Sequence, residues 1–242
     1  MSKIKEAFTG VRALIPFITC GDPSLDVTAE IIKKAEENGA DAAVLAIPFS
    51  DPTAEGAALQ AASLRALKGG VTTDTIFEML KNVRRAIKMP LICMTYANVV
   101  FSYGIEKFLS LCREAEIDGL MLRDVPVEER EEFAPLCAAY GVDFIIAAAP
   151  GKSERIQKIC AAAEGFLLLP GAEEAAIAPL AAEAKKYTDI PIVVTYSGTD
   201  KMLPKAGDGV MVDTTVVEAV GAYGTDAPEK IAKLIKELKN TL

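Results

Sequence analysis

The sequence predicts an α/β fold, a single (β/α)8 TIM barrel that takes in residues 1–242. Short apolar runs rich in β-branched residues recur along the chain, and most are followed by an amphipathic segment with helical spacing. Eight such units fit the size of one barrel of this class, about 250 residues. The runs are apolar along their whole length, as expected of parallel strands that are buried on both faces.

The predicted strands begin where local signals end the preceding helix. In Gly141-Val142-Asp143 a glycine allows the left-handed conformation that commonly closes a helix, and an aspartate completes the turn. Pro90 and Pro191 introduce two other strands, because proline cannot continue a helix. The predicted strands are 13–18, 42–47, 91–95, 120–123, 144–147, 166–169, 192–195 and 210–212.

The segments between the strands have helical periodicity. In the last of them, Ile231, Leu234, Ile235 and Leu238 fall on one face at i, i+3, i+4 and i+7. The clearest predicted helices are 25–38, 73–88, 105–115, 127–139 and 227–240. A doubly wound sheet would alternate in the same way, but the chain has no G-x-G-x-x-G after its first strand and no P-loop, so we favour the barrel.

The overall composition predicts a cytoplasmic protein that binds neither nucleic acid nor membrane. Lys and Arg number 26 and Asp and Glu number 34, which gives a formal net charge of −8. A nucleic-acid protein needs a basic footprint. No apolar run approaches the ~18–20 residues that span a bilayer, and the first residues lack the apolar core of a secretory signal.

The absence of histidine restricts the chemistry. It excludes Ser–His and Cys–His nucleophile pairs and His-ligated metal sites, so any proton transfer must use Asp, Glu, Lys, Tyr or water. The cysteines are scattered and never form a C-x-x-C pair, which predicts buried, reduced thiols and no metal site. They are Cys20, Cys93, Cys112, Cys137 and Cys160.

The loops that follow the strands are where a barrel of this class carries its functional residues. The loop after the second strand is predicted to be long, with about 15 residues between Ile47 and the next strongly helical segment, whereas about 2–6 are usual. Loops of that length are often functional, so we expect candidate site residues there.

Four segments, in order along the chain, resemble the tryptophan synthase alpha subunit family. They are 14–23 (Leu-Ile-Pro-Phe-Ile-Thr-Cys-Gly-Asp-Pro), 47–52 (Ile-Pro-Phe-Ser-Asp-Pro), 94–98 (Met-Thr-Tyr-Ala-Asn) and 124–129 (Asp-Val-Pro-Val-Glu-Glu). The resemblance implies a lyase of tryptophan biosynthesis, which cleaves indole-3-glycerol phosphate to indole and glyceraldehyde 3-phosphate by a retro-aldol reaction. It also implies that this chain uses no cofactor, and that a PLP-bearing beta chain receives the indole. That partner would contact the segment from Pro48 to Pro52, Asn98 and Asp124.

The same resemblance locates the catalytic and indole-binding positions. It puts Val44 where the family has a glutamate as general acid/base, and Glu55 where the family has an aspartate that handles the indole N–H. Phe17, Met94 and Met121 would line the indole pocket. Valine can neither donate nor accept a proton, whereas a carboxylate general acid/base is worth ~10²–10⁴ in rate.

The phosphate site implied by the resemblance is also altered. Ser197 and Gly198 stand in for one glycine-rich turn, and Asp213 and Thr214 for another. A carboxylate ~4 Å from a phosphate oxygen costs on the order of 4 kcal/mol for each pair of unit charges at an effective dielectric of ~20. The family's lid after the sixth strand is shortened here to Pro170-Gly171-Ala172-Glu173.

Two more side chains are candidates for the site. Tyr96 follows the third strand and could assist proton transfer. Arg123, after the fourth strand, is expected either to pair with Asp124, Asp213 or Glu55 or to bind an anionic ligand, and we favour the ion pair.

Three functions remain open from the sequence. The chain could be a working lyase in which Glu55, with water or Tyr96, replaces the missing base. It could be a non-catalytic paralogue that serves as a binding or regulatory partner of a beta chain. It could also be a barrel that now binds another small-molecule ligand. The departures at Val44 and Asp213 favour impaired or lost family activity.

Overall fold

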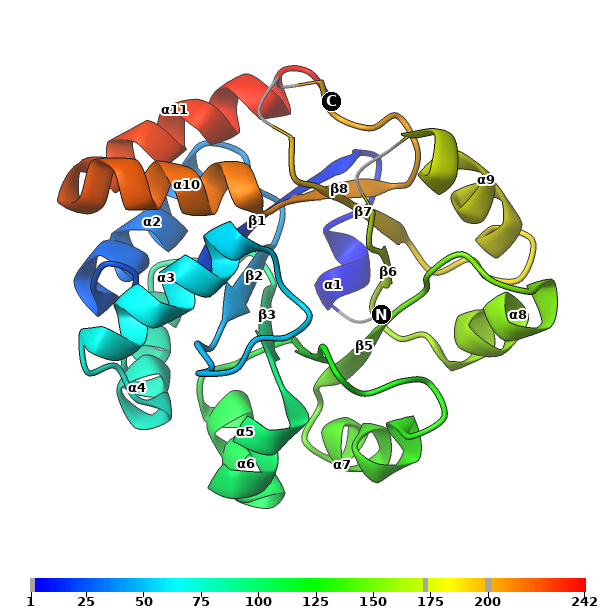
Figure 1. Ribbon diagram of the computed structural model, residues 1–242, viewed down its shortest axis with the longest axis horizontal. Coiled ribbons are helices and arrows are strands. Elements are labelled where there is room, and N and C mark those ends of the chain that lie inside the picture. Colours follow the sequence, from blue (N-terminus) through cyan, green and yellow to red (C-terminus); the bar gives the residue numbers. More distant parts are fainter. Residues whose placement is uncertain (1–2, 172–173, 199–201) are drawn as a thin grey trace.

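A computed structural model describes residues 3–171, 174–198 and 202–242. Eight parallel strands follow one another in chain order around a closed barrel, and the last pairs with the first (Figure 1). They are β1 (Ala13–Thr19), β2 (Ala43–Ala46), β3 (Leu91–Thr95), β4 (Gly119–Leu122), β5 (Asp143–Ala147), β6 (Leu167–Leu169), β7 (Ile192–Tyr196) and β8 (Gly209–Val212). The predicted TIM barrel is confirmed, and every predicted strand boundary lies within one residue of the observed one.

The helices surround the barrel, and the short α1 lies in the middle of the view in Figure 1. They are α1 (Lys3–Glu6), α2 (Leu25–Glu37), α3 (Ala57–Lys68), α4 (Thr73–Arg84), α5 (Ala97–Tyr103), α6 (Ile105–Glu114), α7 (Ala134–Ala139), α8 (Ser153–Ala162), α9 (Glu174–Ala184), α10 (Thr214–Tyr223) and α11 (Ala227–Lys239), with 3-10 turns η1 (Arg130–Glu132) and η2 (Gly224–Asp226). None of these helices is long and apolar enough to cross a membrane within the described residues.

Three expectations about helix boundaries were wrong. The helix expected over 73–88 ends at Arg84. The helix expected over 127–139 begins only at Ala134, because Pro135 fits the first turn of a helix but not its interior. The helix after β2 begins at Ala57, so the loop that precedes it is shorter than predicted. The early start was missed because Gly56 at the N-cap makes no side-chain capping bond that the sequence could signal.

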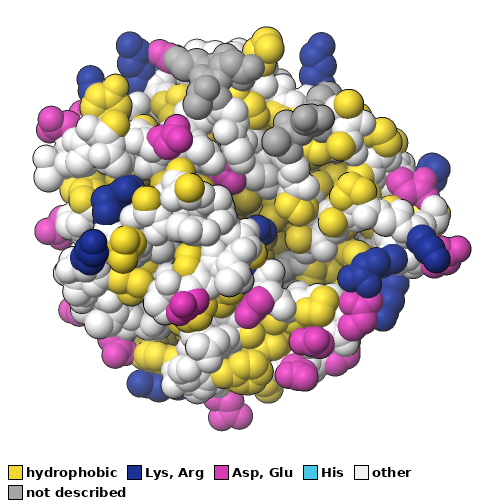
Figure 2. All heavy atoms as spheres, in the orientation of Figure 1, with side chains coloured by type: hydrophobic (Ala, Val, Ile, Leu, Met, Phe, Trp, Pro, Cys, Tyr) yellow, Lys and Arg dark blue, Asp and Glu magenta, His cyan; other side chains and the backbone are white. Residues whose placement is uncertain are grey.

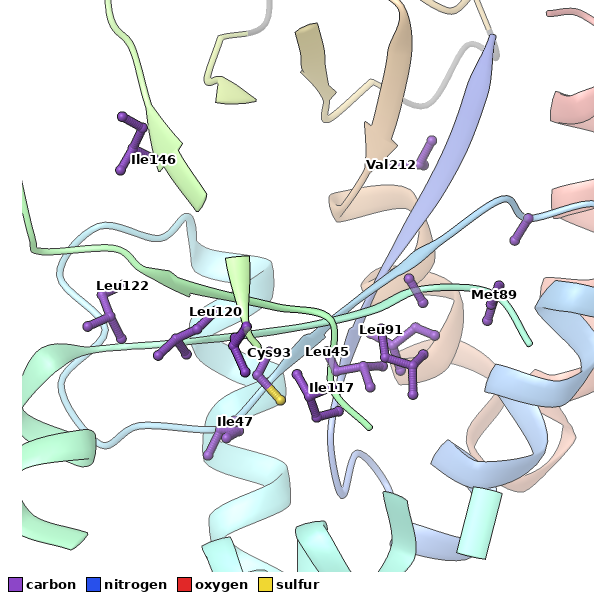
Figure 3. Close-up of a cluster of buried hydrophobic side chains, with 14 of the residues drawn as sticks. Leu45, Ile47, Met89, Leu91, Cys93, Ile117, Leu120, Leu122, Ile146 and Val212 are labelled. Atoms are coloured by element: carbon purple, nitrogen blue, oxygen red, sulfur yellow. The ribbon is translucent and has the colours of Figure 1, made fainter. Parts of the chain in front are cut away.

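Alternation along the strands separates two apolar layers. In β2 and β3, Val44, Ala46 and Met94 belong to the cluster inside the barrel. Leu45 and Cys93 point the other way, into the layer between barrel and helices that Figure 3 shows. This is the period of two that parallel strands impose. All five cysteines are buried and free, as predicted.

An ion pair fixes the start of the chain's first βα loop against α3. The carboxylate of Asp22, which is 2% exposed, accepts hydrogen bonds from Nε and Nη2 of Arg65 at 2.8 and 2.7 Å. A bidentate contact of this kind sets orientation as well as distance. It therefore helps to hold the helix whose first turn borders the mouth of the barrel.

We predict that Arg65→Leu lowers the free energy of unfolding by about 2 kcal/mol, because it leaves a buried carboxylate without its charged donor. Urea titration followed by circular dichroism measures the change. Lys186→Met is the control, since Lys186 pairs with Glu183 at the surface, and its loss should lower the stability far less. Equal losses in the two variants would contradict the role assigned to the Asp22–Arg65 pair.

Candidate functional site

A cavity of about 330 Å³ opens at the carboxyl ends of the strands. Figure 2 shows a hollow in the middle of this face with hydrophobic side chains inside it. Besides two residues of the predicted lid, seven candidate site residues line the cavity. They are Phe17, Glu55, Met94, Arg123, Ser197, Asp213 and Thr214.

The apolar part of the cavity comes from two directions. Phe17 and Met94 rise from the barrel interior, and Met211 joins them from β8. Leu59, in the first turn of α3, covers the opposite side. Sequence reasoning missed Leu59 because α3 starts earlier than expected. It missed Met211 because the candidates near the eighth strand came from the loop that follows it. The alternation of β8 was the signal that could have revealed Met211.

Val44 lies deeper, within the barrel. It is fully buried and stands in register with Phe17 on β1 and Ile92 on β3. Its neighbours in this layer are apolar side chains. The position therefore offers neither a proton donor nor a proton acceptor, and Val44 is not among the residues that line the cavity.

Asp213 caps the amino end of α10. Its carboxylate accepts a hydrogen bond from the backbone N–H of Thr214 and another from the Ser197 hydroxyl at 2.7 Å. A helix amino terminus attracts anions because its first N–H groups are unpaired and its dipole is positive there. The protein's own carboxylate thus occupies donors that would otherwise be available to a bound anion.

Glu55 is held at the mouth by a clamp on the preceding residue. The backbone N–H of Ala54 donates to the Tyr96 hydroxyl at 3.1 Å, and the Ala54 carbonyl accepts from Nη2 of Arg123 at 3.0 Å. The tyrosine ring in turn packs on Phe49, with centroids 5.1 Å apart. Side chains from β3 and β4 therefore fix the β2–α3 loop, and Glu55 with it.

The environment of Glu55 favours its protonated form. Burial raises the pKa of Glu55 above the ordinary glutamate value, and the nearby negative charge of Asp213 acts in the same direction. The positive charge of Arg123 and a hydrogen bond with Tyr96 lower the pKa but do not cancel the effect of burial. A carboxyl with a raised pKa in a cavity can act as a proton donor.

Arg123 does not form the close ion pair that we favoured. Among the described residues, its hydrogen-bond partner is the Ala54 carbonyl, and its buried Nε has none. Asp124 instead accepts a hydrogen bond from the backbone N–H of Ala97 at 2.8 Å, at the start of α5. The guanidinium reaches across to the loop backbone, and this geometry keeps it from closing on a carboxylate.

Three other predicted site residues lie around the cavity but do not line it. Tyr96 is buried behind the loop. Met121 faces the barrel interior and borders a neighbouring hollow with Arg123. Gly198 accepts a hydrogen bond from Thr215 through its carbonyl and lies so close to the Tyr196 ring that a side chain would clash. Of the predicted lid, Pro170 and Gly171 line the cavity, and residues 172–173 lie outside the described residues.

The positions predicted to contact a partner chain lie beside the mouth. In the segment from Pro48 to Pro52, Pro48 is buried, while Ser50 and Asp51 are exposed. Asn98 and Asp124 are exposed too, at the ends of β3 and β4. They form a polar rim on the same side of the barrel as the cavity.

Comparisons with known proteins agree over the whole chain. The family model described as "Tryptophan synthase alpha chain" matches residues 4–241. A tryptophan synthase alpha chain from Lacticaseibacillus casei is 34% identical, and the match covers 99% of this chain and 95% of that protein. A solved protein from Aquifex aeolicus superposes with a TM-score of 0.93 at 31% identity, covering 100% and 99% of the two chains. A chain of a tryptophan synthase complex from Pyrococcus furiosus gives 0.88 at 30% identity, covering 94% and 98%.

We predict that Glu55 makes stability depend on pH. Because its folded pKa lies above the ordinary 4.5, the folded chain holds a proton that the unfolded chain has already lost, so Glu55 reduces stability as pH rises through the raised pKa. Thermal unfolding from pH 4 to 8 should therefore show the wild type losing stability relative to Glu55→Gln over that interval. Parallel profiles for the two proteins would contradict the raised pKa.

Proposed function

This chain belongs to the tryptophan synthase alpha chain family, and we propose that its indole-3-glycerol phosphate lyase activity is impaired or lost while the ligand cavity is kept. The proposal is carried by Val44, which is fully buried among apolar side chains. The resemblance assigns the general acid/base to this position. No proton can be exchanged there, and the chain has no histidine to take over.

The anion site supports the same proposal. The phosphate of the family substrate would meet the carboxylate of Asp213, which already uses the N–H of Thr214 and the hydroxyl of Ser197. The phosphate would lose these donors and would also face a like charge. Asp213 therefore weakens binding of the phosphorylated substrate both by charge repulsion and by occupying hydrogen-bond donors.

We propose that the chain serves as a binding or regulatory partner of a PLP-dependent beta chain in the cytoplasm. A Pyrococcus furiosus relative is described as a tryptophan synthase α2β2 complex. The exposed rim of Ser50, Asp51, Asn98 and Asp124 beside the cavity supports a contact there. PLP would belong to the partner, and this chain would contribute the cavity and the rim.

A second candidate function is residual lyase activity with Glu55 as the acid/base. The observation that favours it is the raised pKa of this cavity-lining carboxyl, together with its hydrogen bond to Tyr96. A general acid is most effective when its pKa approaches the working pH. This second function uses the same cavity as the first and differs from it only in that substrate is turned over.

We predict that purified protein releases no indole from indole-3-glycerol phosphate above background. The double variant Val44→Glu, Asp213→Gly should gain less than about tenfold, because the loop after β6 also departs from the family pattern. A restored acid/base alone is worth ~10²–10⁴, so a gain of that size would show that these two positions were the main block. Indole absorbance or fluorescence provides the measurement.

The Glu55→Gln variant separates the two candidate functions. If the wild type does release indole, the second candidate requires Glu55→Gln to lower the rate by about 10²-fold or more. Release by the wild type that survives in Glu55→Gln would contradict both proposals for the acid/base chemistry. A thermal unfolding curve for each variant confirms that the barrel is intact.

We predict a complex with the cognate beta chain, measured by light scattering. Asp51→Lys should weaken it at least tenfold, because Asp51 is exposed on the proposed rim. Glu154→Lys is the matched control, since Glu154 is exposed on α8, away from the rim residues, and should leave the complex unchanged. Absence of any complex with the wild type would refute the proposed partner role.

A further inference from the structure

The described charged groups of the cavity come from three elements. Glu55 lies on the β2–α3 loop, Arg123 follows β4 and Asp213 follows β8. Each acid has donors within the protein. Asp213 accepts from Ser197 and from the N–H of Thr214, and Glu55 is hydrogen-bonded to Tyr96.

Arg123 differs from the two acids in its hydrogen-bond partner. Its one hydrogen bond among the described residues goes to a neutral backbone carbonyl, that of Ala54, at 3.0 Å. A guanidinium carries five N–H donors and a permanent positive charge. Arginines in partly buried sites are normally paired with a carboxylate or a phosphate. The cavity is therefore lined by a cation that acts on Glu55 through its charge, but whose N–H donors are largely unused among the described residues.

The other residues that line the cavity indicate what kind of body carries the ligand's charged group. Phe17, Leu59, Met94 and Met211 give the cavity an apolar side. Its volume of about 330 Å³ is at the small end of ligand pockets, which span ~300–1,000 Å³. The site suits a compact apolar body that carries one anionic group.

The number of charges favours a carboxylate over a phosphate. The cavity already holds two acids and one guanidinium, so a monocarboxylate adds one negative charge beside Glu55 and Asp213, whereas a phosphate dianion adds two. The planar guanidinium also matches the geometry of a carboxylate. The anion position at α10 is already occupied by Asp213, so a phosphate gains no donors there.

We propose that the cavity binds a small unphosphorylated monocarboxylate with an apolar body, and that Arg123 binds its carboxylate. This inference rests on the proposed function, in which the cavity is kept as a binding site. Arg123 is then the residue that determines ligand specificity, and Phe17, Leu59, Met94 and Met211 contact the apolar body.

Isothermal titration with matched probes tests the proposal. Indole-3-propionate carries the carboxylate, indole-3-propanol replaces it with a neutral hydroxyl, and glycerol 3-phosphate carries a phosphate without the apolar body. Because a charge-assisted hydrogen bond is stronger than a neutral one, the wild type should bind the propionate at least about tenfold more tightly than the propanol. It should show no measurable binding of glycerol 3-phosphate.

Substitutions assign the preference to Arg123. Arg123→Met should reduce the preference for propionate over propanol to less than about twofold. Arg123→Lys keeps the charge but loses the planar donor array, so it should retain part of the preference for propionate. This variant keeps the test decisive if Arg123→Met does not fold. Arg155→Met is the control, because Arg155 is exposed on α8 and pairs with Glu128 outside the cavity.

Four results would overturn the inference: equal binding of propionate and propanol, no binding of either, a preference that survives in Arg123→Met, or measurable binding of glycerol 3-phosphate. These outcomes are distinct from failure of the proposed function, which is decided by indole release and by complex formation. Indole release by the wild type would refute the loss of activity even if the propionate bound as expected.

Discussion

The alternation of side chains around a closed barrel is the constraint on which the rest of this structure depends. Every second residue of a strand must enter an interior that has no room for solvent, so that interior is filled with apolar groups. Val44 and Met94 are inside for this reason, and Leu45 and Cys93 are outside. The lower part of the cavity is apolar as a direct consequence, and polar groups reach it from the loops and strand ends at the mouth.

Under the proposed function, few positions separate a shared fold from a shared chemistry. Similarity to the alpha chains runs from one end of the chain to the other, yet the proposed loss of activity depends on a few places only: Val44, Asp213 and the loop after β6. Asp213 stabilises a helix but limits the binding of an external anion. Its carboxylate satisfies an N–H at the start of α10 and so stabilises the helix, but it also occupies donors at a position where an external anion could bind. Fold membership therefore does not by itself specify turnover.

The Ala54 clamp connects the site to the barrel. Tyr96 and Arg123 extend from adjacent strands and hold the two backbone groups of one loop residue, which sets the position of Glu55. The same clamp explains why Arg123 pairs with no acid, since its reach is directed to the loop carbonyl. A single arrangement thus fixes a carboxyl with a raised pKa and leaves the buried Nε of Arg123 without a partner among the described residues.

The sequence by itself determined the barrel and its strands, because apolar runs, helix-ending glycines and prolines act over a few residues. It also excluded histidine chemistry, since the chain has no histidine. Only the tertiary structure decided that Leu59 and Met211 line the cavity, that α3 begins at Ala57, and that Arg123 bonds a carbonyl and pairs with no acid. These facts depend on groups far apart in the chain, and their meeting is set by how strands and loops pack in space.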